Sequence, residues 1–336
     1  MKKILLIGYG TLGEYAAEEL LNLGWSIDVI ALEEHVSLNR NIRFIKGNAT
    51  DALLTGLFSQ NRYGAVIDFI HYEDTEAFKL RAKLMLNNTD QYIFLSSYRV
   101  YADSAAPITE KSARLLNTVN DPYFLEHETY AIPKSKNENT LRESGRKNWT
   151  IVRPLISFSH YRLDLTTQGG YILITRSRAG KEILLPEVSR LKIAGVGWAG
   201  NVGRMLGRLA GNSAALGEDF TLGSGEAQTW ETVAGYYSET LGAKFRWIPG
   251  EDYLRYTTGD DYMMRCALYY DRAYDRRIDA GKVLKVTNLA PSDLLTIRQG
   301  IIRELSVLSE RPELVERMGG DIHRMISQRM DEYPGK

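Results

Sequence analysis

A glycine-rich turn near the start of the sequence constrains the fold of this chain more than any other feature. Gly8-Tyr9-Gly10-Thr11-Leu12-Gly13 follows the apolar run Ile4–Ile7 and precedes a segment whose apolar residues recur at helical spacing. In such a strand–turn–helix unit, the first glycine permits a tight turn and the second lets the backbone approach a pyrophosphate. The third glycine allows the helix to pack closely on the strand, and the amides at the start of the helix can bind an anion. The turn predicts a dinucleotide site, with a purely structural glycine turn as the alternative.

Strand-like and helix-like segments alternate over the first 155 residues. The runs predicted as buried strands are Ile4–Ile7, Ile27–Leu32, Ile42–Lys46, Ala65–Ile70, Tyr92–Leu95 and Trp149–Arg153. Helices are expected after the glycine turn, at about 75–87 and near 129–145. Repeated strand–helix–strand units favour a parallel sheet that is covered on both faces. We therefore expect an α/β fold, a Rossmann-type doubly wound parallel sheet with a smaller C-terminal substrate-binding lobe.

The pattern is less regular beyond Pro154, where Arg, Tyr and Gly are more frequent. Val196–Leu209 and Thr229–Leu241 are predicted as helices, and Phe220–Leu222 as a short strand. We expect residues 1–155, completed by about 193–223, to form an NAD(P)-binding Rossmann domain. The remaining segments, 156–192 and 224–336, are expected to form the substrate-binding lobe. No obvious flexible linker separates the two, which predicts a close interface.

Composition narrows the functional classes. Lys plus Arg equals Asp plus Glu at 42 each, which disfavours nucleic acid as a partner because such binding normally requires a basic excess or stripe. The single cysteine, Cys266, excludes an internal disulfide and fits a reducing compartment. The first apolar run stops at Gly8 and acidic residues follow, so no secretory or membrane-spanning segment is predicted there. No spacing typical of metal ligands occurs. We expect a cytoplasmic protein without a metal site.

The residues after the second predicted strand bear on the choice of dinucleotide. The local sequence is Ile30-Ala31-Leu32-Glu33-Glu34, and Glu33 is the candidate for binding the adenine ribose hydroxyls. A carboxylate there favours NAD, because it would repel the 2′-phosphate of NADP. Arg40 and Arg43 are near enough in sequence to bind a 2′-phosphate, so NADP is not excluded as the cofactor. Alternatively, Glu33 is a solvated surface residue without a role in binding.

A tyrosine and a lysine lie one helical turn apart in Tyr130-Ala131-Ile132-Pro133-Lys134. A lysine ammonium at that spacing favours the phenolate, so a group with an ordinary pKa near ~10 could act as a base at neutral pH. Pro133 fits a helix if Tyr130 lies in its first turn. Because chance predicts roughly one such pair in a chain of this composition, its meaning depends on the surrounding motifs.

These motifs together resemble the extended short-chain dehydrogenase/reductase superfamily, and more closely its NAD-dependent epimerase/dehydratase family, which acts on nucleotide sugars. The resemblance covers nearly the whole chain. Gly47-Asn48-Ala49-Thr50-Asp51 is similar to the family's segment near the adenine. Phe94–Tyr101 matches the signature of the fifth strand. The remaining matches are the Tyr-x-x-x-Lys-x-x-x-Glu helix, at Tyr130, Lys134 and Glu138, and the dipeptide Arg153-Pro154 that closes the sixth strand.

The resemblance implies a role for each matched residue. Tyr130 would take a proton from a substrate hydroxyl while a hydride leaves the same carbon for the nicotinamide. Lys134 would lower the pKa of the tyrosine and bind the nicotinamide ribose, and Ser97 would hold the reacting oxygen. Besides these three catalytic residues, the implied cofactor-binding residues are Gly8, Gly10, Thr11, Leu12, Gly13, Glu33, Asn48, Ala49, Ile70, His71, Ser96 and again Lys134.

We therefore expect an NAD-dependent epimerase, dehydrogenase or reductase that acts on a hydroxyl of a sugar, with a nucleotide sugar as the favoured substrate. A 4,6-dehydratase ranks lower, because Tyr98 and Arg99 stand where related dehydratases have an acid/base pair. A diphosphate would require Arg or Lys from the C-terminal half. The candidates, among which the sequence does not choose, are Arg162, Arg176, Arg178, Lys192 and Arg255.

Several departures from the family pattern support a competing hypothesis. Phe69-Ile70-His71-Tyr72 replaces the usual small residues after the fourth strand, and Pro133 replaces the usual serine. The asparagine that related enzymes carry shortly after the Arg-Pro dipeptide is absent. These features look like an atypical branch in which some members associate with RNA. The alternative is a non-catalytic or regulatory NAD(P)-binding protein associated with RNA or protein. For the enzyme, the family resemblance implies a homodimer.

Overall fold

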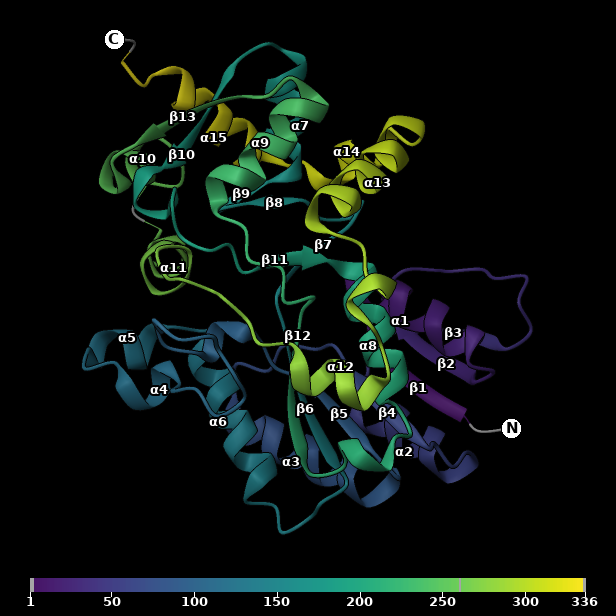
Figure 1. The fold of residues 1–336 in the computed structure, drawn as a ribbon. Helices are drawn as coiled ribbons and strands as arrows, with labels where there is room; N and C mark the ends of the chain where they lie inside the picture. Colours follow the sequence, from purple (N-terminus) through teal and green to yellow (C-terminus); the bar gives the residue numbers. More distant parts are fainter. Residues whose placement is uncertain (1–2, 260, 335–336) are drawn as a thin grey trace.

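A seven-stranded parallel sheet covered by helices on both faces forms the lower part of the computed structural model, which describes residues 3–259 and 261–334 (Figure 1). The strand order is β12-β6-β5-β4-β1-β2-β3. These strands are β1 (Lys3–Ile7), β2 (Ser26–Ala31), β3 (Ile42–Lys46), β4 (Ala65–Asp68), β5 (Tyr92–Leu95), β6 (Trp149–Pro154) and β12 (Glu218–Leu222). The predicted doubly wound α/β fold is confirmed.

The strand order reverses between β1 and β4, which are neighbours in the sheet. Ile7 at the end of β1 lies opposite Ile30 of β2 on one side and opposite Asp68 of β4 on the other. The connections that leave β1 and β4 therefore run to opposite sides, which opens a crevice at the carboxyl ends of these strands. The glycine turn after β1 and the loop after β4 border this crevice.

Six helices cover the two faces of the sheet in the described part of the chain. One face carries α1 (Thr11–Asn22), α8 (Ala199–Leu209) and α12 (Gly281–Thr287), and the other carries α2 (Asp51–Gln60), α3 (Thr75–Asn88) and α6 (Ala131–Arg142). α1 and α8 pack very closely, since a Cβ atom added to Gly203 would lie 2.5 Å from the Cβ atom of Tyr15. β12 and α8 come from the segment predicted to complete the sheet, and α12 packs against both.

Two local predictions differ from the structure. Helix α2 was not predicted, although Thr50 is a good N-cap residue and its hydroxyl accepts a hydrogen bond from the Leu53 amide at 3.2 Å. Val196–Trp198, predicted as the start of a helix, forms the strand β11. These residues pair in parallel with β7 (Ile156–Phe158), so the tertiary pairing overrides the helical pattern and the helix begins at Ala199.

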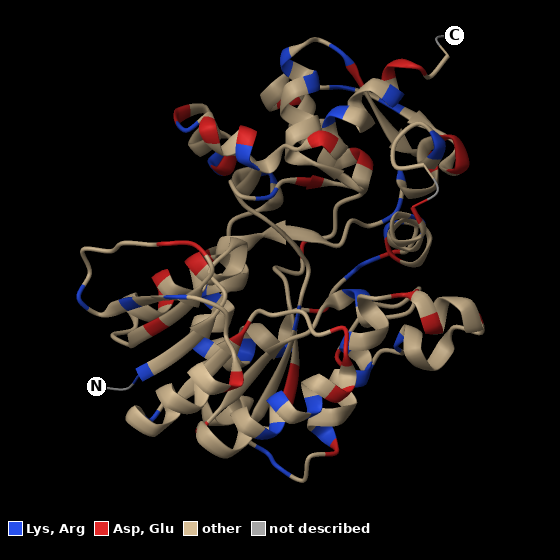
Figure 2. Cartoon of the chain, turned by 180° about the vertical axis from the view of Figure 1, so that it is seen from behind, with Lys and Arg blue, Asp and Glu red and all other residues tan. Residues whose placement is uncertain are grey.

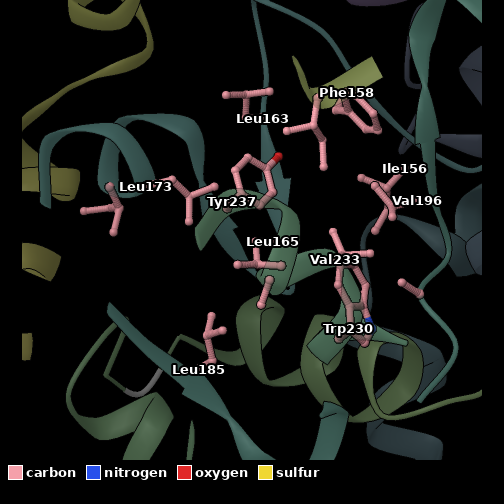
Figure 3. Close-up of a cluster of buried hydrophobic side chains, with 14 of the residues drawn as sticks. Ile156, Phe158, Leu163, Leu165, Leu173, Leu185, Val196, Trp230, Val233 and Tyr237 are labelled. Carbon is pink, nitrogen blue, oxygen red and sulfur yellow. The ribbon is translucent and has the colours of Figure 1, made fainter. Parts of the chain in front are cut away.

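The second lobe lies above the sheet in Figure 1 and has its own apolar core. Besides β7 and β11, its strands are β8 (Asp164–Leu165), β9 (Gln168–Gly169), β10 (Glu182–Pro186) and β13 (Lys244–Ile248). Its main helices are α7 (Gly170–Arg178), α9 (Trp230–Leu241), α10 (Gly250–Arg255), α11 (Tyr262–Ala267), α13 (Ile297–Glu310), α14 (Glu313–Met318) and α15 (Asp321–Asp331). In Figure 3, Trp230, Val233 and Tyr237 of α9 face Leu165 and other buried side chains of this core.

Short helices complete the chain. α4 (Leu115–Thr118) and α5 (Pro122–His127) precede α6. The shorter helical turns are η1 (Tyr98–Val100), η2 (Glu187–Ser189), η3 (Ser213–Ala215), η4 (Leu268–Arg272) and η5 (Pro291–Asp293). Residues 1–2, 260 and 335–336, which belong to the predicted domains, lie outside the described residues. Between residues 3 and 334, apart from 260, none of the helices has the length and hydropathy needed to span a bilayer.

Charged residues of both signs are distributed over both lobes, as Figure 2 shows. A buried charge cluster outside the crevice joins α13 to α1. Glu304 of α13 is fully buried and accepts hydrogen bonds from the Tyr15 hydroxyl at 2.5 Å, from Trp198 Nε1 at 2.6 Å and from His160 Nδ1 at 2.8 Å. The other ring nitrogen of His160 lies 3.5 Å from the Glu14 carboxylate. Burial lowers the pKa of His160, but Glu14 and Glu304 raise it by more, to about 9.

This cluster predicts a pH-dependent stability. A histidine whose pKa rises from 6.5 in the unfolded chain to about 9 in the folded one stabilises the fold fully below pH 6.5. That contribution is lost as the pH rises through 9, so we expect the free energy of unfolding in urea to fall over this interval. His160→Gln should remove most of the fall, whereas His127→Gln, which changes an exposed histidine, should leave it intact. An unchanged slope in His160→Gln would show that His160 is not the titrating group.

Candidate active site

The glycine turn has the backbone geometry expected of a dinucleotide site. Gly8 has a φ of +103°, which L-residues with a side chain rarely adopt. A Cβ atom added to Gly13 would lie 2.8 Å from the Gly8 carbonyl oxygen, so α1 can approach β1 this closely because residue 13 is glycine. Apart from Gly10 and its two chain neighbours, no atom of the described chain lies within 4 Å of the Cβ position of Gly10, which leaves the amide end of α1 accessible to a ligand.

Two cavities meet at this turn. The outer cavity has a volume of about 610 Å³, and the residues around it include Gly8, Gly10, Thr11, Glu33, Asn48, Ala49 and Ile70. The inner cavity has a volume of about 430 Å³, and the residues around it include the whole glycine turn with Ser96, Ser97, Arg99, Tyr130, Arg162 and Arg272. The two cavities share Gly8–Thr11 and follow the carboxyl ends of the strands across the point where the strand order reverses. An elongated ligand could therefore occupy both.

The outer cavity also contains residues that the sequence did not suggest. His35 lines it, and its ring centroid lies 4.9 Å from that of Tyr9 and 5.1 Å from that of Phe44. Tyr161 and Arg317 reach it from the second lobe. No local sequence signal marks Arg317, because its position over the glycine turn depends on the packing of the two lobes.

Arg43, a candidate partner of the 2′-phosphate of NADP, forms an ion pair with another residue. Its guanidinium donates to the buried Asp28 carboxylate at 2.7 and 3.0 Å. Arg43 lies opposite Asp28 in the register of β3 and β2, three residues before the carboxyl end of β3 at Lys46. In this structure it is therefore not available to a phosphate beside Glu33, which lines the outer cavity from the segment after β2.

Tyr130 occupies the N-cap position of α6, as Pro133 requires. Pro133 is the third helical residue, where the missing amide has no partner within the helix in any case. The buried Glu128 carboxylate accepts hydrogen bonds from the amides of Tyr130 at 3.0 Å and Ile132 at 2.9 Å. Glu128 therefore fixes the first turn of the helix and with it the direction of the Tyr130 side chain.

Cations surround the Tyr130 ring. The Lys134 ammonium lies 5.2 Å and the Arg99 guanidinium carbon 4.8 Å from the ring centroid. Burial raises the pKa of Tyr130, but Lys134, Arg99 and a hydrogen bond with Ser97 together hold it below its ordinary value of 10.0. The structure thus brings together Ser97, Tyr130 and Lys134 beside the glycine turn.

Lys134 is held by main-chain atoms. Its ammonium donates to the carbonyl oxygens of Leu95 at 2.6 Å and Ser96 at 3.3 Å, at the end of β5. The side chain is buried, and burial lowers the pKa of Lys134, while the neighbouring Tyr130 raises it in part.

The two remaining motif residues form one buried ion pair. Arg153 of β6 donates to both oxygens of Glu138 of α6, at 2.7 Å each. The hydroxyl of Ser96 also donates to Glu138, at 2.6 Å. Ser96, which was predicted to bind the cofactor, lines the inner cavity, but its hydroxyl hydrogen is used by Glu138. Burial raises the pKa of Glu138, but Arg153 and its neighbours lower it to about 2. The ion pair fixes α6 against β5 and β6, and therefore positions Tyr130 and Lys134 relative to Ser97.

Two residues beside the inner cavity have clear structural partners. His71, predicted to bind the cofactor, does not line either cavity; its Nε2 donates to the Thr129 carbonyl at 2.7 Å and its ring centroid lies 5.1 Å from that of Tyr130. Burial and the nearby Lys134 lower the pKa of His71. The Tyr98 hydroxyl donates to Asp271 at 2.8 Å, and burial raises the pKa of Tyr98, so it stays protonated at neutral pH and cannot serve as a base.

Of the five basic candidates from the second lobe, Arg162 lines the inner cavity. Arg176 bonds to Ser327 and Asp331, and Lys192 pairs with Asp275 at 3.4 Å. Arg178 and Arg255 are exposed on α7 and α10. Arg99 and Arg272, which were not among the five, also line the inner cavity.

Comparisons with known proteins support the fold. No protein-family model matches the chain, and no curated protein matches its sequence. Among solved structures, it is similar to the epimerase Mth375 from Methanothermobacter thermautotrophicus, with 16% identity, a TM-score of 0.70, and coverage of 94% of this chain and 95% of the other. It is also similar to the enzyme WbmH of Bordetella bronchiseptica in complex with NAD+, with 17% identity, a TM-score of 0.67 and coverage of 93% and 99%.

A third similar structure is the UDP-glucose 4-epimerase of Bifidobacterium longum in complex with NAD+ and UDP, with 17% identity, a TM-score of 0.64 and coverage of 92% and 99%. At this level of identity, the likeness shows that the chain shares the fold of these enzymes over nearly its whole length.

The buried ion pair makes a direct prediction for stability. Glu138→Gln leaves the Arg153 guanidinium buried without its main partner, although Asp219 still contacts it at 2.9 Å. We expect a loss of about 3 kcal/mol in the free energy of unfolding, near the lower end for breaking a buried pair. Glu143→Gln, at the exposed end of α6, is the matched control and should change it little. Equal effects of the two substitutions in urea unfolding would exclude this role for Glu138.

Proposed function

We propose that the chain is a member of the NAD-dependent epimerase/dehydratase family and that it oxidises a hydroxyl of a sugar, favouring a nucleotide sugar, as an epimerase or an oxidoreductase. The observation that carries the proposal is Tyr130, a tyrosine with a lowered pKa that faces the same cavity as the glycine turn. The NAD+ and UDP named for the similar structures support the cofactor and the substrate class.

The residues present fit an NAD molecule that extends through both cavities. The open space at Gly10 and the amides at the start of α1 would hold the pyrophosphate, and Glu33 would bind the adenine ribose hydroxyls. The nicotinamide would lie in the inner cavity near Ser97 and Tyr130. Bound there, NAD+ supplies the acceptor for a hydride.

The side chains of the inner cavity would handle the proton and the oxygen. Tyr130, as phenolate, takes the proton of the substrate hydroxyl while the hydride leaves the carbon that bears it, so that the hydroxyl becomes a carbonyl. Ser97 donates to that oxygen and holds it in place. The Lys134 and Arg99 cations stabilise the phenolate before the proton arrives. An epimerase would reverse these steps on the opposite face of the substrate, whereas a dehydrogenase would release the ketone.

The proposed function predicts that one substitution, Tyr130→Phe, abolishes most of the catalysis and leaves NAD binding intact. Native mass spectrometry of the freshly purified protein should show NAD(H) bound to the chain, and Tyr130→Phe should retain it. The same substitution should lower kcat by about 10²–10⁴-fold, the usual contribution of a positioned proton acceptor. Tyr123→Phe, which changes an exposed tyrosine of α5, should leave kcat unchanged.

Two results would be incompatible with the enzyme hypothesis. If neither NAD nor NADP binds at saturating concentration, the chain does not use a nicotinamide cofactor. If Tyr130→Phe retains full turnover, Tyr130 does not accept the proton. NAD binding without turnover of any sugar nucleotide tested would instead favour the regulatory alternative.

The charges around Tyr130 also predict a pH effect. The groups that face its ring are Lys134 of α6, Arg99 of η1, His71 after β4 and Arg162 of the second lobe. Because a nearby cation favours the phenolate, Arg99→Gln should raise the pKa of Tyr130 and move the acidic limb of the kcat/KM profile to higher pH. Arg99→Lys retains the charge and should largely restore the limb. Identical profiles for wild type and Arg99→Gln would show that Arg99 does not act on Tyr130.

A further inference from the structure

Three arginines from distant parts of the chain converge on the inner cavity. Arg99 belongs to η1, Arg162 to the loop after β7, and Arg272 to η4. In the part of the chain that the structure describes, no Asp or Glu side chain lines this cavity. Three cations without an anion among the lining residues are unusual for a cavity that binds a neutral ligand, since phosphates and carboxylates are the groups that guanidinium recognises best.

The carboxylates that accompany these arginines are buried behind them. Asp271 and Glu128 are 1% and 2% exposed, and Asp164 is 8% exposed. Asp271 accepts hydrogen bonds from Arg272, from Arg276 at 3.0 Å and from the Tyr98 hydroxyl at 2.8 Å. The carboxylates therefore hold the arginines in place and leave the lining of the cavity positive.

Each guanidinium keeps donors that no described protein group uses. Arg99 has carboxylate oxygens of Asp271 and Glu128 at 3.6 and 3.7 Å, which is too far for a hydrogen bond. Arg162 uses Nε and Nη2 on Asp164, at 2.6 and 3.2 Å, so its Nη1 has no protein partner. Arg272 donates from Nε to the Thr166 carbonyl and from Nη1 to Asp271, so its Nη2 is still available to a ligand. A ligand with several acceptor oxygens could satisfy all three.

The position of Arg99 relates this basic group to the chemistry of the proposed function. Its guanidinium carbon lies 4.8 Å from the centroid of the Tyr130 ring, and both residues line the inner cavity. An acceptor group bound to Arg99 would therefore lie within a few bonds of the hydroxyl that Tyr130 deprotonates. Ser97 and Arg272 line the same cavity, so the reacting group and the acceptor group fit side by side.

We propose that the substrate carries an oxyanion, a carboxylate or a phosphate, close to the carbon that is oxidised, and that Arg99, Arg162 and Arg272 bind it. The proposal rests on the proposed function, because the role of Tyr130 defines the reacting end. A carboxylate and a phosphate ester on the reacting sugar have the same chemistry here, and either can lie beside the oxidised carbon, unlike the diphosphate that the proposed function already implies. Arg162 and Arg272 belong to the second lobe, so this lobe would select the substrate by charge.

Binding of matched probes to the NAD+-saturated protein tests the proposal without turnover. Isothermal titration compares glucuronate with glucose, which differ in one carboxylate, and glucose 6-phosphate with glucose, which differ in one phosphate group. We expect the charged member of at least one pair to bind about tenfold more tightly or better, since a charge-assisted bidentate contact is worth at least one factor of ten. A preference for glucuronate identifies the anion as a carboxylate, and a preference for glucose 6-phosphate identifies it as a phosphate.

Substitutions connect the preference to the arginines. Arg162→Gln and Arg99→Gln should each reduce it several-fold, and Arg162→Lys should restore part of it. Arg178→Gln, which removes an exposed arginine from α7 outside the cavity, should retain the full preference. Thermal melting of each variant shows that the fold is intact, and Arg162 is suited to substitution because its side chain is 54% exposed.

The outcomes separate this proposal from the proposed function. Equal binding within both probe pairs, or a preference that survives both Arg162→Gln and Arg99→Gln, would overturn the anion site even in a protein that binds NAD+ and turns over a sugar. Tyr130→Phe should keep the preference, because Tyr130 acts on the hydroxyl. A chain that keeps the arginine-dependent preference but loses no activity on Tyr130→Phe would retain the anion site and contradict the catalytic assignment.

Discussion

The buried ion pair between Glu138 and Arg153 determines how the catalytic helix sits on the sheet. Burying two charges is costly, and the cost is offset when every oxygen and most donors are bonded. Here Glu138 accepts from Arg153, Ser96 and Arg114, while Arg153 also reaches the Tyr101 hydroxyl at 2.7 Å. The pair connects α6 to the ends of β5 and β6, so the first turn of α6, with Tyr130 and Lys134, has little freedom to shift against Ser97.

The site consists of two cavities that meet at the glycine turn and are formed by different parts of the chain. The outer cavity is built largely from the carboxyl ends of β1 and β2 and the segment after β3, so the sheet alone nearly completes it. The inner cavity needs η1, the start of α6 and two arginines of the second lobe. The sheet therefore provides the shape suited to a nucleotide, while the charge of the reacting region depends on how the two lobes pack.

Local patterns in the sequence predicted what depends on local structure. The glycine turn, strands β3 and β5 and the helix that follows Tyr130 agree with periodicity and with the backbone demands of glycine and proline. Motif resemblance predicted Glu138 and Arg153 as members of one family pattern, but not that they bond to each other. Helix α2 was missed despite the N-cap at Thr50, and β11 was mistaken for helix because its pairing with β7 is a tertiary contact.

The arginines around Tyr130 show why the remainder of the site could not be predicted. Arg99, Arg162 and Arg272 are separated by more than 60 residues at each step, and no spacing in the sequence distinguishes them from the exposed Arg178 and Arg255. The same holds for the salt bridge between His160 and Glu304, which lie 144 positions apart. Such convergence results from the packing of complete lobes.

Among the residues that the structure describes, Lys134 donates to the carbonyl oxygens of Leu95 and Ser96 and to no carboxylate. A carboxylate in direct contact would cancel much of the ammonium's field, whereas two neutral carbonyl groups leave more of its charge to act on Tyr130. Because these anchors are main-chain atoms, they persist whatever side chains occupy those positions. The contribution of Lys134 to the lowered pKa of Tyr130 therefore does not depend on which side chains occupy positions 95 and 96, so these positions can change with the substrate while the lysine stays in place.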